Sequence, residues 1–363
     1  MNIREIAKLA EVSTSTVSRV VNHIPGVQPH LAERVWKTVG KMGYFPNRHA
    51  SALASGRSRV FGLITPQPAN LFFPEVIQSF EHFAADHNYE VLLMFANRDG
   101  CMEVAVRRML GRGVDGLAIL SLRVEESLMD ALRIRKVPAI LLDAAADPLR
   151  PVSREVGAIR VRYKPGIRRA VRHLVALGHT EIAFVSGPAQ LESARARQNA
   201  FQECMREIRL KIPPGFIIAG DHTLEGGMRA LQQITREGKR PTAVLCSNDM
   251  TAIGLLREAY DQGIEIPEDL SVVGIDGVAF SRCTTPPLST VEVPAIALAQ
   301  YAFKTLRDMA EKRSGSSAAR RHDVLTSFVP RQSTCKRQSR QPSQAAPAMG
   351  PSIGALNEFA IEP

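Results

Sequence analysis

Between Val60 and about Pro330 the chain alternates short β-rich runs with amphipathic helical patterns, and this alternation constrains the fold more than any other feature. Strands that alternate with helices form parallel sheets flanked by helices. The length of this stretch suits two doubly wound units, one after the other. We therefore predict an α/β fold with strands near 60–64, 90–95, 116–120, 139–143, 182–186, 216–219, 243–247 and 271–276 and helices near 73–86, 167–177, 194–207 and 250–261.

Residues 1–58 have a different texture, with short helical patterns and little strand signal. Asn2 precedes the first pattern and Glu5 follows it three positions later, which is typical of a capping box at a helix N-terminus. Ser13 opens a second pattern that runs to about Asn22. Two short helices joined by so tight a turn predict an all-α helix-turn-helix head in front of the α/β core.

The outward face of the second predicted helix carries only side chains that form hydrogen bonds, which suits a helix in the major groove of DNA. Residues 1–59 also contain nine Lys and Arg against three Glu, so +6 of the chain's net charge of +10 lies there. A localised basic domain is what the neutralisation of DNA phosphates requires. The outward residues are Thr14, Ser15, Ser18, Arg19 and Asn22.

Two sequence strings carry a resemblance to a known family. IREIAKLAEVSTSTVSRVVN at positions 3–22 and GYFPN at positions 43–47 resemble signatures of the lactose/galactose-repressor (LacI/GalR) family. The resemblance covers nearly all the chain to about Pro330. It implies a transcriptional regulator, most simply a repressor, that binds a pseudo-palindromic operator as a homodimer and a small-molecule effector in its core. It implies no cofactor. Glu11 departs from the family, which usually has a glycine in this turn.

By position, the resemblance implies that Thr14, Ser15 and Arg19 contact base edges. The guanidinium of Arg19 matches the O6 and N7 acceptors of guanine. The alternative for Arg19 is a bond to a phosphate or to an acid of its own helix. The side chains that we expect to position the helix on the DNA backbone are Ser13, Thr16, Ser18 and Asn22.

Residues 47–58 are predicted to be a hinge helix and linker, with Asn47 as the helix cap. The resemblance implies that two hinge helices pair in the dimer and enter the minor groove. Leu53 takes the position of a wedging leucine, and an apolar side chain between base steps kinks DNA. The alternative is that Leu53 packs on its own domain.

Residues that end predicted parallel strands are the candidate ligand contacts, because ligands of open α/β sheets bind beyond the carboxyl ends of the strands. By position, the resemblance implies that Arg197 clamps the effector and that Asp249 and Asp276 bind it through their carboxylates. Phe72 and Phe73 either stack on a ring of the effector or fill the core.

Two positions depart from the family in the core. Arg162 stands where an acid is usual, and His222 where an aromatic side chain often stacks on the effector. With Arg197, a second cation at position 162 favours a sugar derivative with an acidic group, because carboxylates and phosphates form charge-assisted hydrogen bonds with arginine. The alternative is that Arg162 faces solvent or pairs with an acid such as Glu155.

The predicted boundaries follow from these patterns. The head spans 1–46, the hinge 47–58 and the effector core 59–330. A tail over 331–363, rich in Gln, Ser, Pro and Ala, is predicted to be disordered. We assign about 59–160 and 291–320 to the N-subdomain of the core, and about 161–290 and 321–330 to its C-subdomain.

Several function classes are disfavoured by the sequence. No window approaches the roughly 20 apolar residues of a membrane span, and no signal segment precedes the head, so we expect no membrane partner and a cytoplasmic protein. Five scattered cysteines disfavour a disulfide framework or a zinc site. Asp249 and Asp276 read as a general acid and base would make a hydrolase, but no nucleophile, metal triad or phosphate loop accompanies them. No leucine heptad follows Pro330, which favours a dimer over a tetramer.

Overall fold

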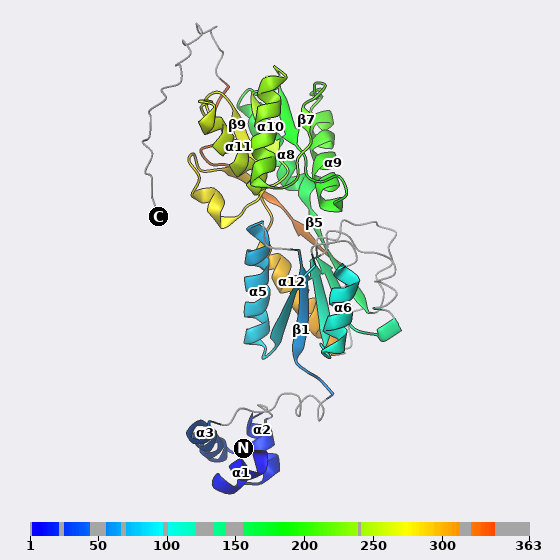
Figure 1. The fold of residues 1–363 in the computed structure, drawn as a ribbon, viewed down its shortest axis with the longest axis vertical. Helices are drawn as coiled ribbons and strands as arrows, with labels where there is room; N and C mark the ends of the chain where they lie inside the picture. The colour runs from blue at the N-terminus through cyan, green and yellow to red at the C-terminus, as the bar shows by residue number, and fades with distance from the viewer. Residues whose placement is uncertain are drawn as a thin grey trace, which may run out of the picture.

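The protein is described here from a computed structural model, which places residues 2–21, 25–43, 56–66, 70–96, 101–120, 132, 134–142, 155–238, 241–311 and 321–337. A helical head lies at one end of the long axis, and two α/β subdomains follow it (Figure 1). This arrangement confirms the predicted fold class. Among the described residues, no helix is both long and apolar enough to cross a bilayer.

The head contains three helices around a small apolar core. The capping box at its start is present, because the Asn2 side chain accepts hydrogen bonds from the backbone of Arg4 and Glu5 while Glu5 accepts one from the Asn2 backbone. Val17 and Val35 are fully buried where the helices meet. The helices are α1 (Ile3–Leu9), α2 (Thr14–Val21) and α3 (Pro29–Met42).

The turn between α1 and α2 is strained at Glu11, whose φ of 48° lies in the left-handed region. A side chain in this region costs roughly 1–2 kcal/mol relative to glycine. Arg34 of α3 ties the turn down, because its Nη2 donates a 2.6 Å hydrogen bond to the Glu11 carbonyl. The chain therefore keeps the turn shape that a glycine usually provides and holds it through the backbone.

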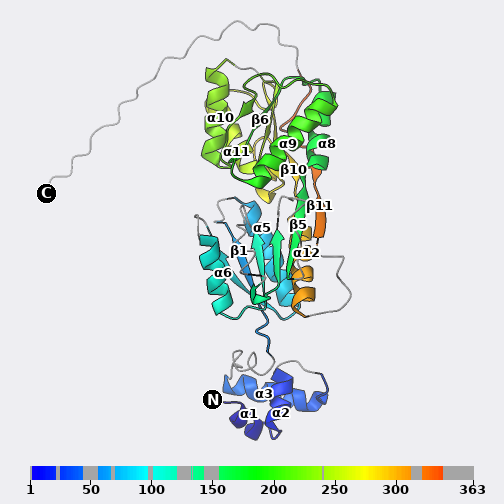
Figure 2. The same ribbon diagram turned by 90° about the vertical axis from the view of Figure 1, so that its right-hand side faces the viewer.

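The N-subdomain is built on a six-stranded parallel sheet with the order β11-β5-β4-β3-β1-β2. Helices α5 (Phe72–Asp86) and α12 (Ala295–Ala310) pack together on one face, and α6 (Cys101–Gly111) covers the other (Figure 2). The strands are β1 (Val60–Thr65), β2 (Glu90–Phe95), β3 (Gly116–Leu120), β4 (Ala139–Leu142), β5 (Val156–Arg162) and β11 (Arg321–Leu325).

The C-subdomain repeats this plan with the order β12-β10-β9-β8-β6-β7, in which only β12 is antiparallel. Helices α8 (Tyr163–Ala176) and α9 (Glu192–Glu207) cover one face of the sheet, and α10 (Leu224–Arg236) and α11 (Asp249–Asp261) the other. The strands are β6 (Ile182–Val185), β7 (Ile217–Ile218), β8 (Ala243–Cys246), β9 (Ser271–Asp276), β10 (Ser289–Glu292) and β12 (Ser327–Val329).

The chain crosses between the subdomains three times, after β5, after β10 and between β11 and β12. Thr326 joins two of the crossings, because its hydroxyl lies 2.9 Å from the Arg162 carbonyl and accepts from the Gly166 backbone at 3.0 Å. A Cβ on Gly166 would stand 2.5 Å from Val291 of the remaining crossing. The three crossings are thus packed together at the junction of the two subdomains.

Two predicted boundaries differ from the structure. Residues 321–325 lie in the N-subdomain sheet as β11 and not in the C-subdomain. Residues 331–337 pack on the C-subdomain and are not disordered, because the buried Ser333 hydroxyl accepts from the Ser289 backbone and donates to the Val272 carbonyl. The rest of the predicted tail lies outside the described residues.

The strain at Glu11 gives a testable prediction. Glu11→Gly should raise the stability of the head by about 0.5–1 kcal/mol, because the strain is relieved while the greater entropy of glycine in the unfolded chain offsets part of the gain. The bond from Arg34 to the backbone carbonyl remains. Trp36 is the single tryptophan of the chain and lies on α3, so urea unfolding followed by its fluorescence reports on the head. Glu11→Ala is the control, since it removes the carboxylate but keeps the strain. Equal midpoints for wild type and Glu11→Gly would contradict the prediction.

Candidate functional site

The outward face of α2 is open to solvent. Thr14, Ser15 and Arg19 are all exposed, at the start of the helix and one turn further on. Val17 and Val20 turn inward and anchor the opposite face in the head core. The helix therefore presents two hydroxyls and a guanidinium on a rigid support, which is the donor and acceptor set that base edges require.

The remaining predicted DNA contacts either bond to neighbouring residues of α2, are partly buried, or lie outside the described residues. The Ser13 hydroxyl accepts a hydrogen bond from the Thr16 backbone at 3.0 Å and so caps α2. Its oxygen also lies 2.7 Å from the Ser15 hydroxyl and 2.8 Å from that of Thr16. Ser18 is partly buried. Three predicted contacts lie outside the described residues: Asn22, Asn47 and Leu53.

A buried ion pair lies where the carboxyl ends of the C-subdomain strands face the N-subdomain. Arg197 of α9 forms an ion pair with Asp276, with its Nη2 2.9 Å from Asp276 Oδ1, and both side chains are almost fully buried. Its Nη1 donates to the Ser247 carbonyl at 2.6 Å. The structure thus brings together two of the predicted effector contacts, one from a helix and one from a strand end.

Asp276 ends β9 with a strained backbone. Its φ of 130° lies in a region that is nearly restricted to glycine, and such strain concentrates at functional sites. Burial raises the pKa of the Asp276 carboxyl, and the Arg197 charge opposes this rise. Both the backbone conformation and the burial of the charge at Asp276 cost free energy. Such a cost is expected at a residue that binds a ligand.

Two residues at this ion pair were not assigned from the sequence. The Tyr163 ring lies under the Arg197 guanidinium, 4.5 Å from its centroid to Cζ, and its hydroxyl lies 3.1 Å from Nη2. Asn70, in the loop before α5, donates from Nδ2 to Asp276 Oδ2 at 3.0 Å. Position alone could have suggested both residues, because Tyr163 follows Arg162 and Asn70 precedes Phe72.

His222 lies beside the ion pair with a hydrogen bond between its Nε2 and the Ser247 hydroxyl, at 2.9 Å. A Cβ on Gly187 would overlap the imidazole ring, so the glycine makes room for it. Burial and the Arg197 charge lower the pKa of His222 to about 3. A serine next to a histidine can act as a nucleophile and its general base. Here His222 is a weak base because its pKa is low, and Ser247 is fully buried, so the pair favours binding over catalysis.

Asp249 lies beneath the site. Its Oδ2 accepts from the backbone of Gly277 at 2.8 Å and of Val278 at 2.9 Å, and its Oδ1 accepts from the Thr290 hydroxyl at 2.5 Å. Burial and the neighbouring Asp276 charge raise its pKa to about 7. Because it is fully buried and its oxygens accept from the turn after β9 and from β10, Asp249 shapes this turn, and its contact with the effector stays a prediction.

The structure corrects the expectation for Arg162. Its side chain is 47% exposed and pairs with Asp323 of β11 at 3.4 Å, next to a two-bond pair between Arg160 and the same carboxylate. It adds no second cation to Arg197, because residues 160 and 162 share the face of β5 that carries Asp323. Arg162 therefore gives no support to an acidic effector, and the charge of the effector stays a prediction.

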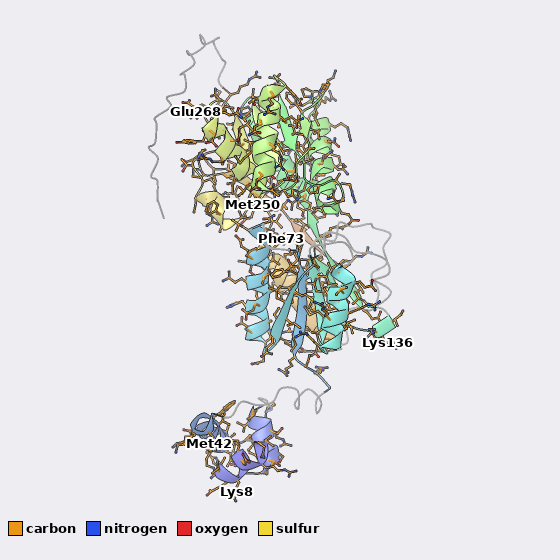
Figure 3. The ribbon with its side chains drawn as sticks, viewed as in Figure 1. Lys8, Met42, Phe73, Lys136, Met250 and Glu268 are labelled. Carbon is orange, nitrogen blue, oxygen red and sulfur yellow. The ribbon has the colours of Figure 1, made fainter. Side chains whose placement is uncertain are left out.

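The aromatic pair at the start of α5 is divided between two environments. Phe72 is buried in the N-subdomain core, and its ring contacts Phe73 edge to face at 6.0 Å. Phe73 is partly buried and lies at the end of the N-subdomain that faces Met250 of the C-subdomain (Figure 3). Of the two, Phe73 is placed to meet a ligand between the subdomains.

Comparison with known proteins supports the arrangement of the domains. Residues 2–47 match the family described as bacterial regulatory proteins, lacI family, and residues 171–334 match a periplasmic binding protein-like domain. Catabolite control protein A of Priestia megaterium is 29% identical over 320 residues, which are 88% of this chain and 95% of that protein.

Two further comparisons cover nearly whole chains. The transcriptional repressor PurR of Klebsiella pneumoniae (strain 342) is 31% identical over 329 residues, 89% of this chain and 94% of that repressor. The crystal structure of the lac repressor dimer bound to operator and the anti-inducer ONPF superposes with a TM-score of 0.80 and 29% identity, over 92% of this chain and 99% of that one. These relatives are transcriptional regulators and not enzymes. The chain is therefore a DNA-binding transcriptional repressor of the LacI family, with an effector-binding core.

Proposed function

We propose that this repressor binds a pseudo-palindromic operator as a homodimer and that a small molecule in the cleft at Arg197 and Asp276 controls the binding. The observation that carries the proposal is the strained, buried Asp276 at the junction of two subdomains behind a DNA-reading head. Asn70 donates to the Asp276 carboxylate and the Tyr163 hydroxyl accepts from the Arg197 guanidinium. A polar ligand would replace these hydrogen bonds with its own. Because a bacterial operator lies in the cytoplasm, we expect the repressor to act there.

The chemistry of the cleft favours a sugar or another hydroxylated ligand. A carboxylate accepts two hydroxyl hydrogen bonds, and Arg197 and the neutral His222 add further polar groups. The Arg197 charge is balanced by Asp276 at 2.9 Å, so this part of the cleft has no excess positive charge for an acidic group. Phe73 supplies an apolar surface on the other side of the junction. A neutral polyol suits this combination better than an anion does.

The recognition surface is proposed to be α2, with Arg19 as the guanine contact and with Thr14 and Ser15 beside it. The support is their joint exposure on one helix of a basic head. The hinge, with Asn47 as a cap and Leu53 as the minor-groove wedge, stays a proposal from the sequence. A selection of bound sites from random double-stranded DNA by the full-length chain tests this function, and an inverted repeat with half-sites about one helical turn apart is expected. If the selected sites contain no inverted repeat, the proposed operator binding is wrong.

The dimer is proposed to form at the β2 edge of the N-subdomain. Leu93 of this edge strand is 38% exposed and Phe95 is 45% exposed, and Val104 of the neighbouring α6 is also exposed. Exposed apolar edge strands invite association unless they are covered. A two-fold dimer would bury this surface and place two heads for two half-sites.

Arg19→Ala should relax the preference at one base position in each half-site and cost about 1–3 kcal/mol of binding to the selected operator, because a bidentate contact to guanine is lost. The measurement is a titration of the operator and of operators changed at each position. Lys37→Ala removes an exposed cation from α3 and controls for the loss of charge, which should weaken all sequences alike. If Arg19→Ala weakens all sequences equally, Arg19 is a phosphate contact.

Leu93→Glu should shift the protein from dimer to monomer, because it places a charge in the proposed apolar interface. Sedimentation velocity across a range of concentrations measures the effect. Leu325→Glu is a matched control, since Leu325 is 64% exposed on β11, at the opposite edge of the same sheet. A dimer that survives Leu93→Glu, or dissociates equally with Leu325→Glu, would refute the proposed interface.

A further inference from the structure

We propose that Asn70 and Glu75 are positioning residues that hold the cleft closed when it contains no ligand. Both belong to the start of the α5 region in the N-subdomain. Asn70 bonds to the last residue of β9 in the C-subdomain, and Glu75 bonds to the chain three residues after it. The inference rests on the proposed function for its purpose, because a ligand at Asp276 has to enter this cleft. The contact itself is a property of the chain alone.

Asn70 connects the two subdomains through both ends of its amide. Its Oδ1 accepts from the Phe72 backbone at 2.9 Å, which fixes the side chain at the start of α5. Its Nδ2 donates to Asp276 Oδ2 at 3.0 Å, while Arg197 occupies the other oxygen. The amide thus stands where a ligand hydroxyl would donate to the carboxylate.

Glu75 forms the second contact, one helical turn further along α5. Its Oε1 accepts from the Ala279 backbone at 2.8 Å, at the start of the short helix η1 (Ala279–Arg282). The adjacent Val278 backbone donates instead to Asp249, inside the C-subdomain. The Ala279 amide is therefore protected by a bond between the subdomains, whereas the neighbouring Val278 amide is protected by a bond within the C-subdomain.

A ligand that uses Asp276 Oδ2 as its acceptor must displace Asn70, since Asn70 already donates to this oxygen and the carboxylate is only 1% exposed. Such a ligand has to bring its own hydrogen-bond donor, because a buried carboxylate without a partner is costly. After loss of the Asn70 bond, the Glu75 bond to Ala279 still connects α5 to the C-subdomain. Asn70 therefore selects for ligands with a donor and couples their entry to movement of the subdomains.

The test is residue-by-residue amide hydrogen exchange of the full-length chain without ligand or DNA. In the wild type, Ala279 should be protected. Asn70→Asp keeps the acceptor for Phe72 but replaces the donor with a second carboxylate, and Glu75→Ala removes the acceptor for Ala279. Each should speed Ala279 exchange about tenfold or more, since hydrogen bonds to charged groups shift equilibria by that order. Glu75→Gln keeps an acceptor oxygen and should restore most of the protection.

Val278 serves as the internal control and should exchange alike in all variants. If Asn70→Asp also loses protection at Val278, that substitution disturbs the C-subdomain itself. The comparison of Glu75→Ala with Glu75→Gln then decides whether the closing contact exists. Rapid Ala279 exchange in the wild type, or equal exchange in Glu75→Ala and Glu75→Gln, would overturn the proposal. These outcomes are independent of the DNA selection, so failure of the closing contacts and failure of the proposed function are distinguishable.

Discussion

The ion pair between Arg197 and Asp276 is the interaction on which the organisation of the cleft depends. Burying two charges costs several kcal/mol for each ion, and their attraction compensates only when further hydrogen bonds satisfy both groups. Here the surrounding elements supply part of those bonds: Tyr163 lies under the guanidinium, the Ser247 carbonyl accepts from it, and Asn70 donates to Asp276 Oδ2. Asp276 Oδ1 accepts no hydrogen bond from the described residues and depends on the Arg197 charge. One pair thereby ties α8, α9, β9 and the loop before α5 to a single point.

This placement follows from the topology. Parallel strands end at the same edge of a sheet, so the loops after them meet there, and the three crossings put the N-subdomain directly opposite. The packed joint at Gly166 and Thr326 limits how the subdomains move relative to each other. Breakage of the Asn70 bond is therefore expected to become a movement of whole subdomains, because packed interfaces change between discrete arrangements.

The sequence predicted the fold class, the head and the central strands, because their hydrophobic periods are unambiguous. It missed the crossing strands β5 and β11, whose arginines and acids lie on a partly exposed sheet face and break the apolar run. The site was predicted in part. Arg197 and Asp276 were both chosen as effector contacts, but their pairing with each other was not predicted. That pairing, the burial of Asp249 and the Asp323 partner of Arg162 depend on contacts between residues more than 25 positions apart. No local pattern encodes such contacts.

A double-mutant cycle on the free energy of unfolding tests the role of the ion pair most directly. Arg197→Met and Asp276→Asn, each alone, should lower that free energy by about 3–5 kcal/mol, because each leaves a buried charge without its partner. The double variant should lose less than the sum of the two by about 0.5–3 kcal/mol. Urea titrations of the full-length chain, followed by far-ultraviolet circular dichroism, provide the four values. Losses that simply add would show that the two charges do not depend on each other and would contradict this account.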